Sequence, residues 1–513
     1  MTQYTVVTFA PVQGFIEKTR KLRDLYGASL ILSHLSYRLV QEANKTAEVI
    51  SPAIPSLQKG MPNRILIKGD FSRDQVHNTL LSAWKELLYE CRTWIERKLP
   101  GKYHWEREWQ NLGNHAWEIF RGEGESIKAA MDDLERCKLS RGWTGLNWIG
   151  ESSSLTGADA IAFPGLGAED RNPNNRVWRR EKEDIEKFYQ SLARALGHPS
   201  AKESTLFAEN EKISIGELVK RLVAIDSTSI AKKLDIPRLG ESFSDIYRRP
   251  DEITDTEKGR WTGWFMGDGD EVGKYLQKLA SKGDEEVKGF SNAMREWGEN
   301  FVTNFPDDFG RVVYAGGDDF LGVIYSEKSK PQIAAKDALS WLINFSDKWK
   351  QHGVPITVSV GFVWAGHSVP QRDILMHCRE AEQKAKSLGR NRVTIRVVFN
   401  SGQFIEWTCP WHYLNVLIKY QDRDGNSNWN HIYSDLAQLE ARGAFNTNVN
   451  NFDKNLALSF FDIYFPGKGI ELQNNDFARD IIGYQDEDKA CERVTKLVDW
   501  IQDLIKVGFQ MNE

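Results

Sequence analysis

Four aspartates in two short acidic segments are the residues of this sequence best suited to chemistry. Gly316-Gly317-Asp318-Asp319 lies between two runs rich in β-branched and aromatic residues, a pattern typical of a β-hairpin whose turn carries paired carboxylates. Glycines let the backbone bend tightly and approach a ligand, and adjacent carboxylates concentrate negative charge that a hard cation such as Mg²⁺ neutralises. A solvent-exposed turn without a ligand has the same composition, so this segment alone leaves both interpretations open.

The second acidic segment, Gly267-Asp268-Gly269-Asp270, follows an apolar run at residues 261–266 that we expect to be a buried strand. Residues 284–305, which lie between the two segments, have apolar side chains at helical spacing, so the chain can cross over and return beside that strand. Such a connection brings Asp268 and Asp318 together. The sequence therefore predicts a two-metal carboxylate site of the kind used for in-line displacement at phosphorus. A cap on the following helix is the alternative role for Asp268 and Asp270.

The elements that must hold these aspartates follow in the order β-α-β-β-α-β. After the strand at 261–266 we expect a helix at 284–305, a hairpin at 311–325, a helix at 331–352, a strand at 356–364, a helix at 371–388 and a strand at 392–399. In a split sheet of this order the first strand lies beside the central hairpin. The expected fold is therefore a ferredoxin-like α+β domain.

Both acidic segments and the segment from Ala381 to Val393 resemble the three signatures of Palm-type nucleotidyl cyclases. The resemblance implies that Lys386 and Arg390 contact the triphosphate of a bound nucleotide. A solvated helix C-terminus, where basic residues are favourable anyway, is the alternative. Leu276 stands where the diguanylate cyclases have a guanine-contacting Asn, so joining of two guanine nucleotides is not expected.

Composition and charge bound the class of protein. A length of 513 residues predicts three to four domains, and 41% apolar with 27% charged residues is usual for a water-soluble chain. The net charge of −5 gives no overall attraction for nucleic acid, so RNA would meet a local patch or be held by partners. Five scattered cysteines without a Cys-x-x-Cys pair indicate neither a zinc knuckle nor a disulfide framework. No leader or membrane-spanning stretch is visible, so we expect a cytoplasmic protein without membrane contact.

The N-terminal part has the pattern of a second sheet without an acidic turn. We expect strands at residues 1–10 and 63–69 and a helix opened by Pro11. After the second strand we expect a long helical stretch to about residue 137. Two helical runs between the strands are expected to join in a turn at Gly27-Ala28-Ser29.

Four of its segments, at residues 9–16, 22–33, 61–64 and 213–221, resemble successive landmarks of the large subunit of type III CRISPR effector complexes, specifically the type III-B (Cmr) branch. The resemblance implies an α+β chain with two ferredoxin-like Palm domains, a connecting α-rich domain and a C-terminal helical domain. The corresponding ranges are 1–137 for the first Palm, 138–255 for the connecting domain, 256–402 for the Palm with Gly-Gly-Asp-Asp, and 403–513 for the helical domain.

For function, the resemblance implies Mg²⁺- or Mn²⁺-dependent nucleotidyl transfer from ATP, giving a cyclic oligoadenylate when the complex binds target RNA. The expected catalytic carboxylates are Asp268, Asp270, Asp318 and Asp319, of which Asp268, Asp318 and Asp319 hold metal. The expected nucleotide-binding residues are Gly316, Gly317, Lys386, Arg390 and Ser29. The expected partners are other Cmr-type subunits, with guide RNA and target RNA bound through the complex.

The sequence departs from that family in two ways. It contains no His-Asp dipeptide, so HD-type nuclease activity is not expected, and its connecting region has only Cys137 where a zinc knuckle needs four cysteines. Two other functions stay open: a scaffold subunit with a silent Palm, and a stand-alone nucleotide cyclase. The two intact acidic segments argue against the first, and the absence of any sensory module argues against the second. The basic loop at 171–180 either touches nucleic acid or is an exposed loop.

Overall fold

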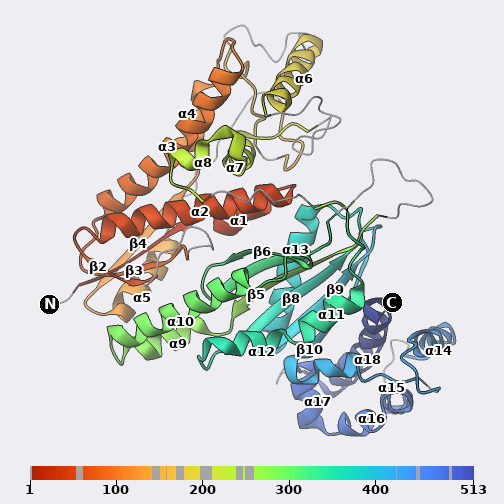
Figure 1. Ribbon diagram of the computed structural model, residues 1–513. Helices are drawn as coiled ribbons and strands as arrows, with labels where there is room; N and C mark the ends of the chain where they lie inside the picture. The colour runs from red at the N-terminus through yellow and green to blue at the C-terminus, as the bar shows by residue number, and fades with distance from the viewer. Residues whose placement is uncertain are drawn as a thin grey trace. The chain divides into compact units, whose positions relative to one another are not determined.

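The computed structural model describes residues 3–52, 62–140, 151–157, 159–168, 178–196, 211–237, 246–248, 259–327, 329–422, 424–445, 451–484 and 488–512. The chain divides into two compact units, Met1–Asp245 with Leu276–Arg295 and Ile246–Tyr275 with Glu296–Glu513. Each unit contains one sheet covered by helices, which confirms the predicted α+β class (Figure 1). The finer division into four domains stays a prediction.

Unit 1 contains a four-stranded antiparallel sheet in the order β2-β3-β1-β4. Its strands are β1 (Tyr4–Ala10), β2 (Glu48–Ser51), β3 (Ile65–Lys68) and β4 (Glu118–Gly124). Strand β4 corrects our expectation of an unbroken helical stretch up to residue 137. Helix α5 packs on β4 so closely that a Cβ on Gly122 would lie 2.4 Å from the Ala130 carbonyl oxygen, so this strand depends on a partner later in the chain.

The helices of unit 1 are α1 (Val12–Glu17), α2 (Leu22–Ala43), α3 (Arg73–Lys98), α4 (Glu106–His115), α5 (Ile127–Leu139), α6 (Trp178–Ala195), α7 (Ile215–Val223), η1 (Asp226–Thr228) and α8 (Ile230–Lys233). The turn expected at Gly27-Ala28-Ser29 is wrong, because α2 runs through it without interruption. A Cβ on Gly27 would lie 2.0 Å from the Lys220 carbonyl oxygen. Gly27 therefore serves close packing of α2 against α7.

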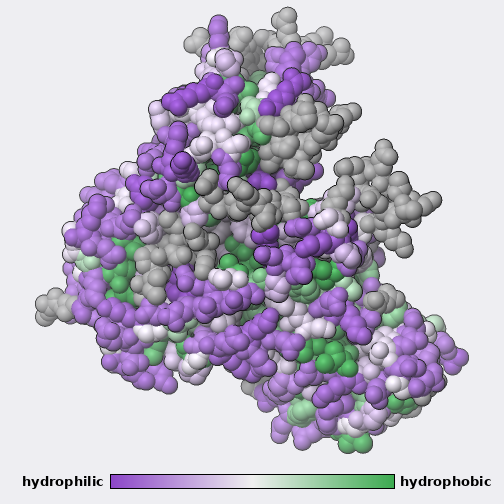
Figure 2. All heavy atoms as spheres, in the orientation of Figure 1, coloured by the Kyte–Doolittle hydropathy of each residue, from purple (hydrophilic) through white to green (hydrophobic). Residues whose placement is uncertain are grey.

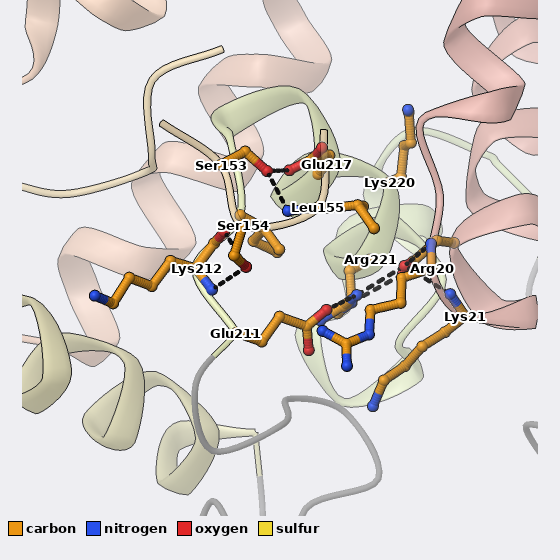
Figure 3. Close-up of polar contacts among 12 residues, drawn as sticks. Arg20, Lys21, Ser153, Ser154, Leu155, Glu211, Lys212, Glu217, Lys220 and Arg221 are labelled. Carbon is orange, nitrogen blue, oxygen red and sulfur yellow. Dashed lines mark hydrogen bonds and ion pairs between the residues drawn. The ribbon is translucent and has the colours of Figure 1, made fainter. Parts of the chain in front are cut away.

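A buried ion-pair cluster ties α7 to α2 (Figure 3). The Arg221 guanidinium donates to both Asp24 oxygens at 2.9 and 2.7 Å and to Glu211 Oε1 at 3.0 Å. The side chains of Arg221, Asp24 and Glu211 are 0%, 3% and 0% exposed. Burial by itself raises the pKa of both carboxyls, but the charge and hydrogen bonds of Arg221 outweigh it and hold both pKa values below their ordinary range.

Unit 2 contains a six-stranded sheet in the order β10-β9-β8-β5-β7-β6, in which only β8 and β9 pair in parallel. Its strands are β5 (Thr262–Gly269), β6 (Gly310–Ala315), β7 (Asp319–Ile324), β8 (Val358–Ala365), β9 (Arg392–Val398) and β10 (Phe404–Pro410). Strands β5 to β9 follow one another as predicted from the sequence, with β6 and β7 as the hairpin. Strand β10 corrects our expectation that the chain is wholly helical after residue 402, and it is held by β9 on one side and by α18.

The remaining helices are α9 (Val272–Ala280), α10 (Asp284–Thr303), α11 (Ala335–Ile343), α12 (Phe345–Trp349), η2 (Lys350–His352), α13 (Gln371–Ser387), η3 (Trp411–Leu417), α14 (Asn430–Ala441), α15 (Asn451–Tyr464), α16 (Lys468–Glu471), α17 (Asn475–Ile482) and α18 (Ala490–Asn512). The division between the units falls within α9 and α10. The single helix predicted at 331–352 is instead α11, α12 and η2 in succession.

Two layers cover the sheet of unit 2. Phe265 and Phe320 on β5 and β7 pack against aromatic residues of α10, α11 and α12, among them Trp297, Trp341 and Phe345. Helix α13 packs on β5, β8 and β9. Its approach to β8 requires a glycine at position 361, since a Cβ there would lie 2.2 Å from the Cys378 carbonyl oxygen. Successive strand residues point to opposite faces, so Asp268 lies on the face opposite Phe265.

On the face of the molecule seen in Figure 2, hydrophilic side chains cover most of the described surface and apolar ones form small groups. Among the described residues, no helix is at once long enough and apolar enough to cross a bilayer.

Candidate nucleotide and metal site

The pairing of β5 with β7 places Asp268 directly opposite Asp319. This register is specified by two reciprocal pairs, in which Phe265 lies over Gly322 and Phe320 lies over Gly267. A Cβ on Gly267 would lie 2.2 Å from the Phe320 ring, so each aromatic side chain needs a glycine across the strand. A slip of one residue would break both pairs and turn the side chains to the wrong face. The aromatic packing thus fixes the position of the two carboxylates.

The hairpin turn brings the third carboxylate to the same end of the sheet. Gly317 has a φ of 153°, a conformation that only glycine adopts easily, and the Gly316 amide donates to the Asp319 carbonyl at 3.1 Å. The Gly269 amide donates to the Asp318 carbonyl at 2.9 Å. The predicted hairpin is therefore present, and it gathers Asp268, Asp318 and Asp319 as the sequence predicted.

These carboxylates repel one another strongly. Directly opposite residues in an antiparallel pair have Cβ atoms about 4.5–5.5 Å apart, and like charges at this separation destabilise a sheet. The dense packing around Asp319, together with the negative charges of Asp318 and Asp268, raises the pKa of its carboxyl to about 7, although the residue keeps access to water. Burial and the charges of Asp319 and Asp268 raise the pKa of the Tyr314 phenol as well. Such a cluster favours binding of a cation.

Helix α13 supplies the cation nearest to the cluster within the described structure. The Lys386 ammonium contacts the Asp268 carboxylate and lies 2.5 Å from Glu382 Oε1, one helical turn earlier. Glu382 is a functional candidate that sequence reasoning missed, although its spacing of four residues from Lys386 is the signal of a helical ion pair. Burial raises the pKa of the Glu382 carboxyl despite the Lys386 charge beside it. The Lys386 ammonium thus pairs with Asp268 of the cluster and with Glu382.

Asp270 differs from the other three aspartates in its surroundings, and its catalytic role stays a prediction. Only 6% of the residue is exposed, and its carboxylate accepts hydrogen bonds from Thr357 Oγ1 at 2.8 Å, Ser359 Oγ at 2.6 Å and the Asn391 amide at 2.9 Å. With both oxygens occupied by donors of the protein, the carboxylate is poorly placed to bind metal. We therefore infer that Asp270 positions the loop after α13.

That loop carries Arg390, the second predicted triphosphate contact. Arg390 and Asn391 both have left-handed backbones, with φ of 62° and 50°, a conformation that costs roughly 1–2 kcal/mol per residue. The bond from the Asn391 amide to Asp270 helps to hold it. Arg390 is exposed, and its guanidinium forms no hydrogen bond or ion pair with a described residue. Arg392, by contrast, is buried and donates to the carbonyls of Ile481 and Asp480, which is a structural role.

The remaining predicted site residue belongs to the other unit. Ser29 is 8% exposed in the interior of α2, in place of the expected turn, and its part in nucleotide binding stays a prediction. The basic loop at 171–180 lies outside the described residues except for the backbone at 178–180, where α6 begins.

Two family models match the chain. Residues 262–394 match the model described as Cas10/Cmr2, second palm domain, and residues 4–59 match that of CRISPR-associated protein Cmr2, N-terminal. The first match spans β5 to the start of β9 and contains every predicted site residue of unit 2. No curated protein matches the chain.

Solved structures that match the chain include those of Csm1-Csm4 cassettes. The chain is 14% identical over 99% of its length and 70% of the other chain to a Csm1-Csm4 cassette in complex with one ATP, with a TM-score of 0.49. The cassette in complex with cA3 is 13% identical over 98% of this chain and 69% of the other, with a TM-score of 0.45. The apo cassette is 13% identical over 98% of this chain and 70% of the other, also with a TM-score of 0.45. The two family matches are consistent with a Cas10/Cmr2 large subunit, the class that the sequence landmarks resemble.

Proposed function

We propose that this chain is the large subunit of a type III-B CRISPR effector complex and that it makes a cyclic oligoadenylate from ATP when the complex binds target RNA. The observation that carries the proposal is the convergence of Asp268, Asp318 and Asp319 beside Lys386, within the segment that matches the second palm domain. A silent scaffold gains nothing from a cluster of repelling carboxylates. Other Cmr-type subunits, guide RNA and target RNA are the partners that the proposal requires, in the cytoplasm.

The residues present fit a divalent cation. Carboxylate oxygens are the ligands that Mg²⁺ and Mn²⁺ prefer, and burial together with the charges of Asp318 and Asp268 raises the pKa of Asp319 to about 7. Asp268 and Asp318 would hold the ion, with Asp319 as the third candidate ligand. A bound Mg²⁺ would supply Lewis-acid stabilisation of charge on the reacting phosphate.

The chain's own side chains bind and orient the nucleotide. The Lys386 ammonium is already held at the carboxylate cluster, where a triphosphate competes with Asp268 and Glu382 for it. The exposed Arg390 guanidinium adds a second positive charge for the pyrophosphate leaving group. Gly316 and Gly317 carry no side chain that would keep a phosphate away from the turn backbone.

Deprotonation of the attacking 3′-hydroxyl needs a proton acceptor near the reacting atoms. Asp319 fits this role better than Asp270, because Asp319 is exposed whereas donors of the protein occupy both oxygens of Asp270.

The test is incubation of the assembled complex with ATP, Mg²⁺ and target RNA, with mass spectrometry of the products. Asp318→Ala combined with Asp319→Ala should abolish the product and leave assembly intact, because the change removes metal ligands and relieves repulsion in a solvent-accessible turn. The matched control is Asp307→Ala with Asp308→Ala, a second adjacent pair of exposed aspartates, just before β6. Wild-type product from the Asp318 and Asp319 variant would show that the site is assigned wrongly.

A further inference from the structure

A second group of metal-ligating side chains lies in unit 2, outside the residues assigned to nucleotide transfer. Asp422 and Asp424 belong to the loop after η3, and His431 is the second residue of α14. One ligand atom from each of the three residues lies within 4.8 Å of the other two.

The geometry of Asp422 points to a ligand. Its Oδ1 accepts hydrogen bonds from the backbone amides of Asp424 at 3.0 Å and Asn426 at 2.7 Å, which fixes the orientation of the carboxylate. Its Oδ2 is buried and has no hydrogen-bond partner among the described residues, and the residue as a whole is only 7% exposed. A buried carboxylate oxygen without a donor is costly, because it has lost its hydration without replacement.

His431, on α14, also has a buried polar atom whose hydrogen bonding is unsatisfied. Its Nδ1 is buried without a hydrogen-bond partner in the described part of the chain, and it lies 3.5 Å from Asp422 Oδ2. A charge-assisted N–H to carboxylate bond is about 2.7–2.9 Å long. Two ligands of one tetrahedral zinc ion, each at about 2.05 Å from the metal, lie about 3.4 Å apart. The observed separation therefore matches two ligands of a shared ion better than it matches an ion pair.

We propose that Asp422 Oδ2, His431 Nδ1 and the Asp424 carboxylate form a binding site for Zn²⁺ or a similar first-row divalent cation, with water as the fourth ligand. The imidazole nitrogen favours such ions over Mg²⁺ and Ca²⁺, which prefer oxygen ligands. Asp424 is exposed, which leaves one side of the site open to water. The amides that bind Asp422 Oδ1 act as the supporting shell that orients a metal ligand.

The loop that carries this site is held at both ends. The Tyr420 ring packs against Trp429 with centroids 4.3 Å apart, and the Tyr420 hydroxyl donates to the Asn428 carbonyl at 3.1 Å. Both rings are buried. Because the loop ends are already fixed, part of the ligand set is in position before a metal ion binds. The bound ion would join the loop to the first turn of α14. The site is independent of nucleotide transfer and serves to stabilise the C-terminal helices.

The test uses the full-length chain carrying Asp318→Ala and Asp319→Ala, so that the other carboxylate cluster does not bind the probe. Zn²⁺ titrated in a calorimeter should bind at one site per chain and raise the melting temperature, and Co²⁺ should give the intense visible absorption of tetrahedral coordination. Absence of both binding and cobalt absorption would overturn the proposal.

In this background, His431→Ala and, separately, Asp424→Asn should each weaken Zn²⁺ binding about tenfold or more and remove the shift in melting temperature. Both side chains are partly or fully exposed, so both variants should fold. The matched control is His412→Ala, because His412 Nε2 lies 3.4 Å from Asp480 Oδ2 in an exposed pair without a third ligand among the described residues. Equal zinc affinity in the His431 and His412 variants would refute the site.

Discussion

Lys386 is the residue whose role the structure sharpens most. Its ammonium contacts Asp268 and Glu382, so a triphosphate must draw it away from one carboxylate or share it. Lys386→Ala should weaken ATP binding roughly 10- to 100-fold, since one charge-assisted contact contributes on the order of 1.5–3 kcal/mol. Competition binding should show no change for adenosine, which lacks phosphate.

The control for this prediction is Lys384→Ala on the same helix. Lys384 Nζ pairs with Glu406 Oε1 at 2.6 Å on β10, outside the carboxylate cluster, so its loss should leave ATP binding unchanged. Equal losses for ATP and adenosine in the Lys386 variant would mean that Lys386 supports the pocket's fold and does not contact phosphate.

Variants of Asp270 test whether a residue's role follows from its place in an acidic sequence motif or from its surroundings in the fold. Asp270→Asn places an amide NH₂ against one of three donors, so we expect a loss of about 1–3 kcal/mol in the free energy of unfolding, with unchanged Mg²⁺ affinity. Asp318→Asn should do the reverse, weakening Mg²⁺ binding without loss of stability. Urea unfolding and Mg²⁺ titration of both variants separate the two roles, and a Mg²⁺ defect in a fully stable Asp270 variant would contradict the positioning role.

At the scale of elements, Gly27 shows how a residue usually taken as a helix breaker can act as a packing residue. Replacing a helical glycine by alanine normally stabilises a helix by about 1 kcal/mol. At Gly27 the added methyl would meet the Lys220 carbonyl at 2.0 Å, so α2 and α7 must separate. Gly27→Ala should therefore lower the free energy of unfolding by about 1–3 kcal/mol.

The sign of the change makes this prediction easy to contradict. Gly289→Ala in α10 is the matched control, because nothing lies within 4 Å of its added Cβ and the residue is exposed. We expect the control to gain stability in chemical denaturation while Gly27→Ala loses it. A gain at both positions would show that α2 and α7 do not pack as closely as described.

Local patterns predicted those elements whose signal lies within their own residues. The apolar run before Asp268, the glycine turn of the hairpin and the helical spacing of α13 all appear at the predicted places within a few residues. Strands β4 and β10 were missed because both are edge strands, held by a neighbouring strand and a helix that packs on them. Their stability comes from tertiary contacts that no short window of sequence contains.

The same limit applies to the candidate site. The convergence of Asp268, Asp318 and Asp319 was predictable from the strand order, whereas the saturation of Asp270 was not. Its donors Thr357, Ser359 and Asn391 are 87 to 121 residues away in sequence. Gly27 likewise meets Lys220, a residue far along the chain. Residue type indicated which groups are chemically capable, and only the assembled fold showed that donors of the protein occupy Asp270.

At the scale of the whole molecule, the N-terminal landmarks that carried the family resemblance contact one another within unit 1. Asp24 and Gly27 from one landmark meet Arg221 and Lys220 from another. The Lys220 ammonium also donates to the carbonyl of Phe15, in a third landmark, at 2.6 Å. These motifs therefore fix how distant segments pack, and the stability of unit 1 should depend on them.

The buried Arg221 cluster makes that stability depend on pH. The pKa values of Asp24 and Glu211 are lower in the folded chain than in the unfolded chain, so in acid the unfolded chain binds more protons. The stabilisation is complete above the ordinary carboxyl pKa of about 4 and is lost as the pH falls through the lower folded values. The free energy of unfolding of unit 1 should therefore decrease steadily on acidification.

Removing one carboxylate should make this decrease shallower. Each group that binds a proton only on unfolding contributes up to about 1.4 kcal/mol per pH unit to the slope, so Glu211→Gln should reduce the acid slope by as much as that amount. Urea unfolding between neutral and acid pH, followed by tryptophan fluorescence, measures this slope.

Glu440→Gln is the matched control, since Glu440 pairs with Lys506 while 36% of its side chain stays exposed. The acid slope of this variant should equal that of the wild type. If Glu211→Gln also keeps the wild-type slope, the cluster does not link protonation to folding. A shallower slope in that variant alone would show that one buried arginine couples segments almost 200 residues apart in the chain to the acid stability of unit 1.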